Sequence, residues 1–138
     1  MSVEEFLRSA REAEIEIGRL EEILLRLDAR AKRVTAVYRQ GGGSGNGPEG
    51  VWIQLSEQRE RMKERLAEAG QQQEAVEAFI AQIGQGRLRE MLRLRFLSGL
   101  SVEEAAARMG YCYDTGKRIS SQAMRAARAA WQSWHAAQ

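Results

Sequence analysis

An unbroken repeat of apolar and small residues at the start of the chain constrains its fold more than any other feature. The repeat alternates steps of three and four residues through Val3, Phe6, Ala10, Ala13, Ile17, Leu20, Leu24, Leu27, Ala31, Val34 and Tyr38. This spacing is the heptad seam of a coiled-coil helix. Ser2 and Glu5 form a capping-box pattern at its start. A helix over about 3–38 would be roughly 54 Å long, and an apolar stripe of that length requires a partner helix.

The next segment is predicted to supply the partner helix. A glycine-rich connector at 41–50 holds six glycines and the only proline, but lacks the Gly-Lys-Ser/Thr ending of a phosphate-binding loop. A second helix is expected over about 51–83, with the seam Leu55, Arg59, Met62, Leu66, Ala69, Gln73, Val76, Ile80 and Ile83. The two helices should pair as an antiparallel hairpin. Arg59 and Gln73 interrupt the seam, and they either set its register, specify an oligomer or lie at its edge.

Composition favours an all-α fold and argues against several other classes. The chain has one proline, 7% aromatic residues and 43% hydrophobic residues. No apolar run approaches the roughly 18 residues that cross a bilayer, and the acidic N-terminus lacks the order of a signal peptide, so a cytoplasmic location is expected. With one cysteine, Cys112, and one histidine, His135, neither a disulfide, a metal site nor a cofactor is expected. No paired-carboxylate or histidine constellation points to an enzyme, so no catalytic residue is assigned.

Charge is distributed unevenly along the chain. Residues 1–86 carry 12 Lys and Arg against 15 Asp and Glu, whereas residues 87–138 carry 9 against 4. This split predicts a polyanion-binding C-terminal domain, 85–138, after a helical hairpin domain, 1–84.

Residues 87–134 follow the order of a helix-turn-helix domain. Gly99 and Gly110 suit the ends of helices, and Ser101 with Glu104 completes a capping box between them. Three helices are therefore expected, over residues 87–97, 101–109 and 113–134.

The last of these helices has two distinct faces. One face carries Gly116, Ile119, Ser120, Ala123, Met124 and Ala127, and the other carries Tyr113, Asp114, Lys117, Arg118, Ser121 and Arg125. The first two turns of a recognition helix enter the major groove, where such side chains bond to bases or phosphates. The second face is therefore the predicted DNA-binding site, while Arg125, Arg128 and the arginines of 87–95 would suit phosphates.

Residues 94–125 resemble the fourth region of bacterial sigma factors, which reads the −35 promoter element. The shared outline is Leu-Arg-Phe-Leu-x-Gly-x-Ser-x-Glu-Glu-Ala-Ala, then Gly-Tyr, then Lys-Arg-Ile-x-x-x-Ala-Met. The layout of the whole chain resembles a phage and prophage family of sigma-like regulators, grouped with late-gene activators of the ArpU and RinA kind. The resemblance implies that the −35-reading positions fall on Tyr113, Asp114, Lys117 and Arg118.

The chain departs from the sigma pattern at two positions. Cys112 stands where a capping hydroxyl is usual, and Gly116 replaces an aliphatic core residue. Glycine there is expected to cost up to about 1 kcal/mol of helix propensity and to leave less core contact. The chain also lacks the core-polymerase-binding region of a complete sigma factor and is not expected to act as one alone.

These patterns predict a phage-type transcriptional regulator that binds double-stranded DNA. Its N-terminal helices would form a homodimer or contact RNA polymerase. Two alternatives remain open: a DNA-packaging protein of the small-terminase type, and a helical adaptor that binds only proteins. A ring of eight or more subunits would favour packaging.

Overall fold

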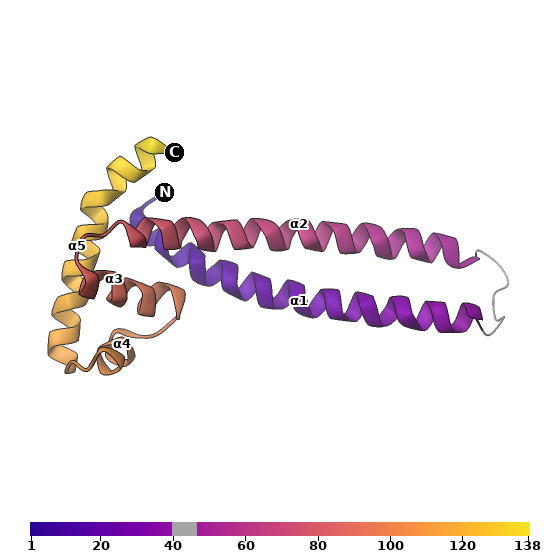
Figure 1. The fold of residues 1–138 in the computed structure, drawn as a ribbon, viewed down its shortest axis with the longest axis horizontal. Helices are drawn as coiled ribbons and strands as arrows, with labels where there is room; N and C mark the ends of the chain where they lie inside the picture. Colours follow the sequence, from indigo (N-terminus) through magenta and orange to yellow (C-terminus); the bar gives the residue numbers. More distant parts are fainter. Residues whose placement is uncertain (40–46) are drawn as a thin grey trace. The chain divides into compact units, whose positions relative to one another are not determined.

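The computed structural model describes residues 1–39 and 47–138, and within these ranges it contains helices and no strand (Figure 1). The elements are α1 (Val3–Arg39), α2 (Gly47–Ala81), α3 (Gly86–Leu92), the π-helical turn η1 (Arg93–Leu97), α4 (Val102–Met109) and α5 (Tyr113–Ala137). This confirms the predicted all-α fold with a long antiparallel helical hairpin. The predicted bounds of the helices agree with these ranges to within about four residues.

The glycine-rich connector is shorter than predicted at its C-terminal end. Residues 41–46 of the predicted 41–50 lie outside the described residues, and Gly47–Gly50 belong to α2. Proline is compatible with the first turn of a helix because its missing N–H has no intrahelical partner there. An acidic residue, Glu49, in the same turn faces the positive end of the helix dipole.

The chain divides into two compact units. The first contains residues 1–14 and 71–138, and the second contains residues 15–70. The domain boundary expected at 84–85 lies inside the first unit, because the start of α1 and the end of α2 share a core with the C-terminal helices.

In the second unit, α1 and α2 run antiparallel along the predicted seam (Figure 1). Leu27, Ala31 and Leu55 are its buried centre, with Trp52 and Met62 packed against them. These buried and packed residues of both helices all belong to, or lie next to, the predicted heptad seams.

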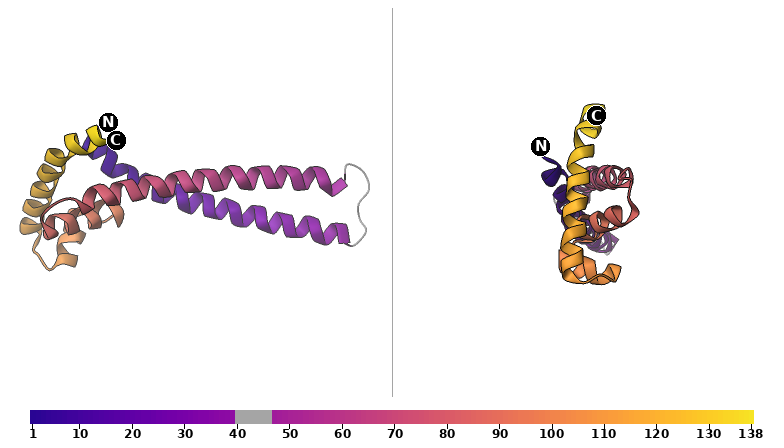
Figure 2. Two further views of the ribbon diagram at one scale, coloured as in Figure 1. Left: turned by 45° about the horizontal axis from the view of Figure 1, so that its top comes forward. Right: turned by 90° about the vertical axis from the view of Figure 1, so that its left-hand side faces the viewer.

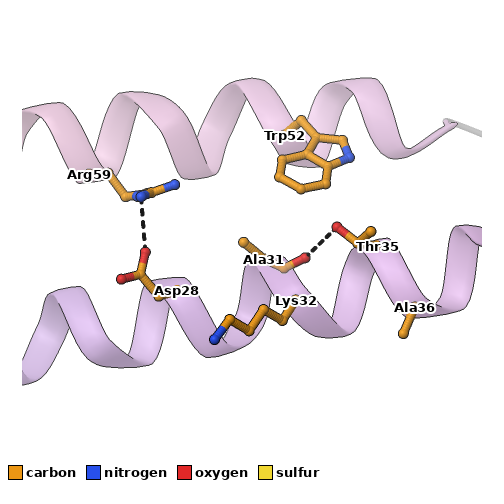
Figure 3. Close-up of a pocket in the computed structure, with 7 residues that line it drawn as sticks. All are labelled: Asp28, Ala31, Lys32, Thr35, Ala36, Trp52 and Arg59. Atoms are coloured by element: carbon orange, nitrogen blue, oxygen red, sulfur yellow. Dashed lines mark hydrogen bonds and ion pairs between the residues drawn. The ribbon is translucent and has the colours of Figure 1, made fainter.

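Arg59 interrupts this seam and forms an ion pair across the hairpin. Its Nη2 lies 3.1 Å from Oδ1 of Asp28 on α1, and Trp52 lies about two turns away along α2 (Figure 3). Both side chains are more than a third exposed, so the pair contributes at most about 1 kcal/mol. The ion pair forms only when Arg59 lies opposite Asp28, so it favours one register of α1 against α2. Arg59 therefore has its partner within the hairpin.

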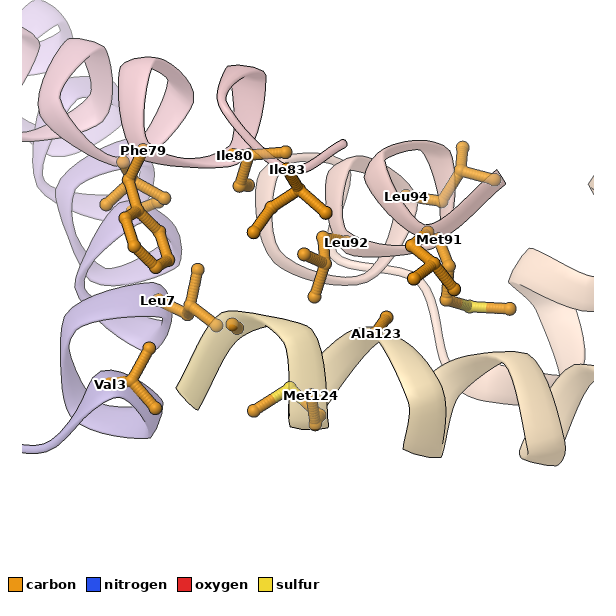
Figure 4. Packing of buried hydrophobic residues seen from close by; sticks show 14 of the residues in the cluster. Val3, Leu7, Phe79, Ile80, Ile83, Met91, Leu92, Leu94, Ala123 and Met124 are labelled. Atoms are coloured by element: carbon orange, nitrogen blue, oxygen red, sulfur yellow. The ribbon is translucent and has the colours of Figure 1, made fainter. Parts of the chain in front are cut away.

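The core of the first unit joins segments from both ends of the sequence. One cluster fully buries Leu7 of α1, Phe79 of α2, Leu92 of α3 and Ala123 of α5 (Figure 4). An aromatic group extends this core: Phe6 lies 5.6 Å from Phe79 and 4.9 Å from Trp131 between ring centroids. These contacts hold α5 against the start of α1 and the end of α2.

Candidate nucleic-acid interface

Local signals in the sequence define the turn before α4. Gly99 has a φ of 73°, which glycine adopts without a steric penalty. The N–H of Leu100 donates to the carbonyl of Leu94 at 2.9 Å, which closes the end of η1. Ser101 then caps α4 with the predicted box: its Oγ accepts from the N–H of Glu104 at 3.1 Å, and its own N–H donates to Glu104 Oε1 at 3.2 Å.

The turn between α4 and α5 begins at the second predicted glycine, Gly110, which is the C-cap of α4. Gly110 has a φ of 83°, and the N–H of Tyr111 donates to the carbonyl of Ala106 at 2.9 Å. Cys112 follows as the N-cap of α5 and makes no side-chain capping bond, as the sequence predicted. Its Sγ instead lies 3.2 Å from Oγ1 of Thr115, and this hydrogen bond lowers the pKa of the exposed thiol.

Gly116 is where α4 and α5 come closest. A Cβ added at Gly116 would lie 2.3 Å from the Cβ of Ala106 and 3.5 Å from its Cα. No two carbon atoms can pack at 2.3 Å, so the helices pack this closely only because residue 116 lacks a side chain. This corrects the expectation that Gly116 leaves less core contact: the backbone of α5 itself fills the space that a larger residue would occupy.

The two predicted faces of α5 differ in exposure as expected: one is buried and the other is exposed. The six residues of the apolar and small face are all buried, and α5 packs against α3 and α4. The six residues of the predicted DNA-binding face, Tyr113, Asp114, Lys117, Arg118, Ser121 and Arg125, are all exposed. Figure 2 shows the N-terminal part of α5 beside α4 in both views.

The first two turns of α5 combine an aromatic ring, an acid and bases. Lys117 Nζ lies 4.8 Å from the centroid of the Tyr113 ring and 3.9 Å from Oδ1 of Asp114. All three side chains are exposed, so these contacts are weak and can exchange for contacts with a ligand. Arg118 is exposed in the same turns.

An open depression continues this face toward the C-terminal half of α5. Four cationic side chains line it, from Arg95 of η1 and from Lys117, Arg125 and Arg128 of α5. The hydroxyls of Ser120 and Ser121 lie among them, and Val102 and Met124 complete the lining. Cations and hydroxyls without a carboxylate in the lining are suited to phosphate oxygens.

Arg95 is held in place at the edge of this depression. Its Nη1 donates to Oγ of Ser120 at 2.8 Å, and its guanidinium lies 4.9 Å from the centroid of Phe96. Partial burial and the nearby charge of Arg8 lower the pKa of Arg95, although an arginine stays charged at neutral pH. A fixed cation near other cations attracts an anion more strongly than a mobile one, because less side-chain entropy is lost on binding.

Arg128 has an acidic partner outside α5. Its Nε donates to Oε1 of Glu4, near the start of α1, at 2.7 Å. This hydrogen bond holds the pKa of the Glu4 carboxyl below its ordinary value of 4.5. The pair therefore connects the first turn of α1 with α5 inside the first unit.

The lowered pKa of Glu4 predicts a pH-dependent contribution to stability. Because the folded protein binds the Glu4 proton less tightly than the unfolded chain, the contribution is complete above pH 4.5 and is lost as pH falls through the lowered pKa. Glu4→Gln should therefore be less stable than wild type at pH 7, and this difference in stability should disappear at an acidic pH below the lowered pKa of Glu4. Urea unfolding at both pH values measures this, with the exposed Glu12→Gln as control. A difference between Glu4→Gln and wild type that is the same at both pH values would contradict it.

Two contributions to this surface could not be assigned from the sequence. The helical period predicts that Ser120 lies on the buried face of α5, but its hydrogen bond with Arg95 joins residues 25 positions apart. Glu4 lies in the first helix, and its partner Arg128 is 124 positions away. No local spacing signals contacts at such separations.

Comparison of the chain with protein-family models, curated proteins and solved structures gave no match. Among the described residues, no group of three or more His, Cys, Asp or Glu side chains could hold a metal ion. None of the described helices is both long and apolar enough to span a membrane.

Proposed function

We propose that the chain is a phage-type transcriptional regulator that binds double-stranded DNA through α4 and α5, in the manner of the sigma region that it resembles. One observation carries the proposal: the six residues assigned to DNA from the sequence are all exposed on α5, whose other side is buried in the unit's core. A helix held rigidly on one side, with polar and basic groups on the other, meets the requirement for reading the major groove.

Each part of the basic surface has a distinct role in this proposal. Tyr113, Asp114, Lys117 and Arg118 occupy the first two turns of α5 and would contact base edges. The depression that contains Arg95 and Arg128 would contact phosphates of the backbone. Phosphate contacts would set the position of α5 on the duplex, and base contacts would select the sequence.

The proposal extends to the setting and the partners of the chain. It would act at promoters in the cytoplasm of a bacterial host, as a homodimer through its N-terminal helices or in contact with RNA polymerase. Paired half-sites one or more helical turns apart would be expected of a dimer.

Binding to fluorescent duplex DNA at several salt concentrations tests the proposal. Wild type should bind, and Lys117→Ala/Arg118→Ala should weaken binding by about tenfold or more, since each base or phosphate contact is worth on the order of 1 kcal/mol. Arg61→Ala/Lys63→Ala removes the same charge from exposed positions of α2 and is the matched control. Equal loss in both variants would show a net-charge effect and refute α5 as the DNA-reading helix.

A further inference from the structure

The first three turns of α1 carry a polar face beside the buried core of the first unit. Leu7 lies in this core, as does Met124 of α5 (Figure 4). Glu4, Arg8 and Arg11 are spaced by four and three residues, so they share one face of the helix. None of the three is buried, and Arg8 and Arg11 are exposed. This polar face is therefore accessible to a ligand.

Both ends of the polar face contact elements of the helix-turn-helix. Glu4 Oε1 accepts a hydrogen bond from Nε of Arg128 on α5 at 2.7 Å. Arg11 lies against the turn before α4, since a Cβ added at Gly99 would lie 3.0 Å from its Cζ. Arg8 lies about one helical turn from both Glu4 and Arg11. Its position on α1 is therefore between the contact with α5 and the contact with this turn.

Arg8 has another cation near it. Its positive charge is close enough to Arg95 to lower the pKa of that guanidinium, and Arg95 is held in place by its hydrogen bond to Ser120. Within the described ranges neither Arg8 nor Arg95 forms an ion pair, whereas Arg11 and Arg128 each have an acidic partner. Two neighbouring arginines of this kind repel each other, and an anion that accepts hydrogen bonds from both removes the repulsion.

A phosphodiester of the DNA backbone suits this pair of arginines. Arg95 lines the basic depression on the proposed DNA-binding surface, so a duplex that occupies the depression also comes close to Arg8. A phosphodiester has two non-bridging oxygens, and each can accept a hydrogen bond from a different guanidinium group. The nearby carboxylate of Glu4 is paired with Arg128, which reduces its repulsion of a phosphate.

We propose that Arg8 and Arg95 together bind one phosphate of the DNA backbone, so that the start of α1 is part of the DNA interface. The inference rests on the proposed DNA binding by α5 and adds α1 to the elements that contact the duplex. A phosphate contact carries no base sequence, so Arg8 should contribute equally to binding of every duplex.

Binding of the full chain to duplex DNA at several salt concentrations tests this role of Arg8. Arg8→Ala should weaken binding to all duplexes by about three- to tenfold and lower the slope of log K against log salt by about 1, whereas Arg8→Lys should keep the slope. Arg30→Ala removes the same charge from an exposed position of α1 and is the matched control. If Arg8→Ala matches Arg30→Ala while Lys117→Ala/Arg118→Ala still loses binding, only the role of α1 is refuted. A wild type that binds no duplex would refute both proposals.

Neutral methylphosphonate linkages, placed one at a time in the duplex, test whether the two arginines share a phosphate. One position should weaken wild-type binding by about threefold or more, and the same position should have little effect on Arg8→Ala and on Arg95→Ala, because the contact is already lost. Other positions should affect all three proteins alike. An unchanged profile for Arg8→Ala would show that Arg8 acts only through net charge, and sensitivity lost at different positions in the two variants would show separate phosphates. Either result would overturn the proposal.

Discussion

Replacement of Gly116 by alanine is expected to lower the free energy of unfolding by about 1–3 kcal/mol, the usual cost of overpacking a core. The added methyl group would lie 2.3 Å from the Cβ of Ala106, so α4 and α5 would have to move apart. Alanine also improves helix propensity by up to about 1 kcal/mol, which offsets part of the loss but not all of it. Urea unfolding followed by circular dichroism measures the change.

Two companion variants separate the clash from other effects of alanine. Gly70→Ala introduces the same methyl group into α2, where nothing lies within 4 Å, and should leave stability equal or raise it. Ala106→Gly/Gly116→Ala removes the opposing methyl group and should regain most of the lost stability. If Gly116→Ala behaves like Gly70→Ala, the close contact of α4 with α5 is not as described.

Arg118→Ala is expected to weaken binding to a preferred duplex by about 1–3 kcal/mol, or roughly 5- to 150-fold, and to relax preference at one base position. The reason is its place in the second turn of α5, where side chains reach base edges. The measurement is the dissociation constant for the preferred duplex and for duplexes changed at single positions.

Arg125→Ala is the matched comparison, because Arg125 lines the basic depression farther along the same helix. It should weaken binding to all duplexes by a similar factor and reduce the slope of log K against log salt by about 1, as expected for a phosphate contact. If Arg118→Ala shows this same uniform loss of binding, Arg118 contacts a phosphate, and the proposal that it contacts a base edge is wrong.

Features of the fold that depend on local spacing could be predicted from the sequence. The seam through Leu20 and Leu27 required a partner helix, and Ser101 with Glu104 marked the start of α4 within a few residues. Gly110 marked the turn into α5 because only its left-handed conformation closes α4 in this way. These signals connect residues that are three to seven positions apart, so they can be recognised as spacings in the sequence.

Features that depend on packing could not be predicted in the same way. Glycine is required at position 116 because Ala106 of another helix lies against it. The sequence alone does not show this contact and predicts only a loss of helix propensity and core contact. The π-helical turn at Arg93–Leu97, in which the N–H of Ser98 donates to the carbonyl of Arg93, interrupts a segment with ordinary helical spacing. The role of Arg59 depends on Asp28, which lies opposite it on α1 and 31 positions earlier in the sequence.

The candidate site shows the same division. Exposure of Lys117 and Arg118 followed from the helical period, because the opposite face of α5 is apolar. The position of Arg95 beside Ser120, and of Glu4 beside Arg128, followed only from the tertiary fold.

Selection of bound sequences from a random duplex pool by the wild-type protein tests the central claim most directly. We expect enrichment of a shared motif, and loss of this enrichment with Lys117→Ala/Arg118→Ala but not with Arg61→Ala/Lys63→Ala. A pool that shows no shared motif after repeated selection, or the same motif with the α5 variant, would contradict sequence-specific DNA recognition by α5.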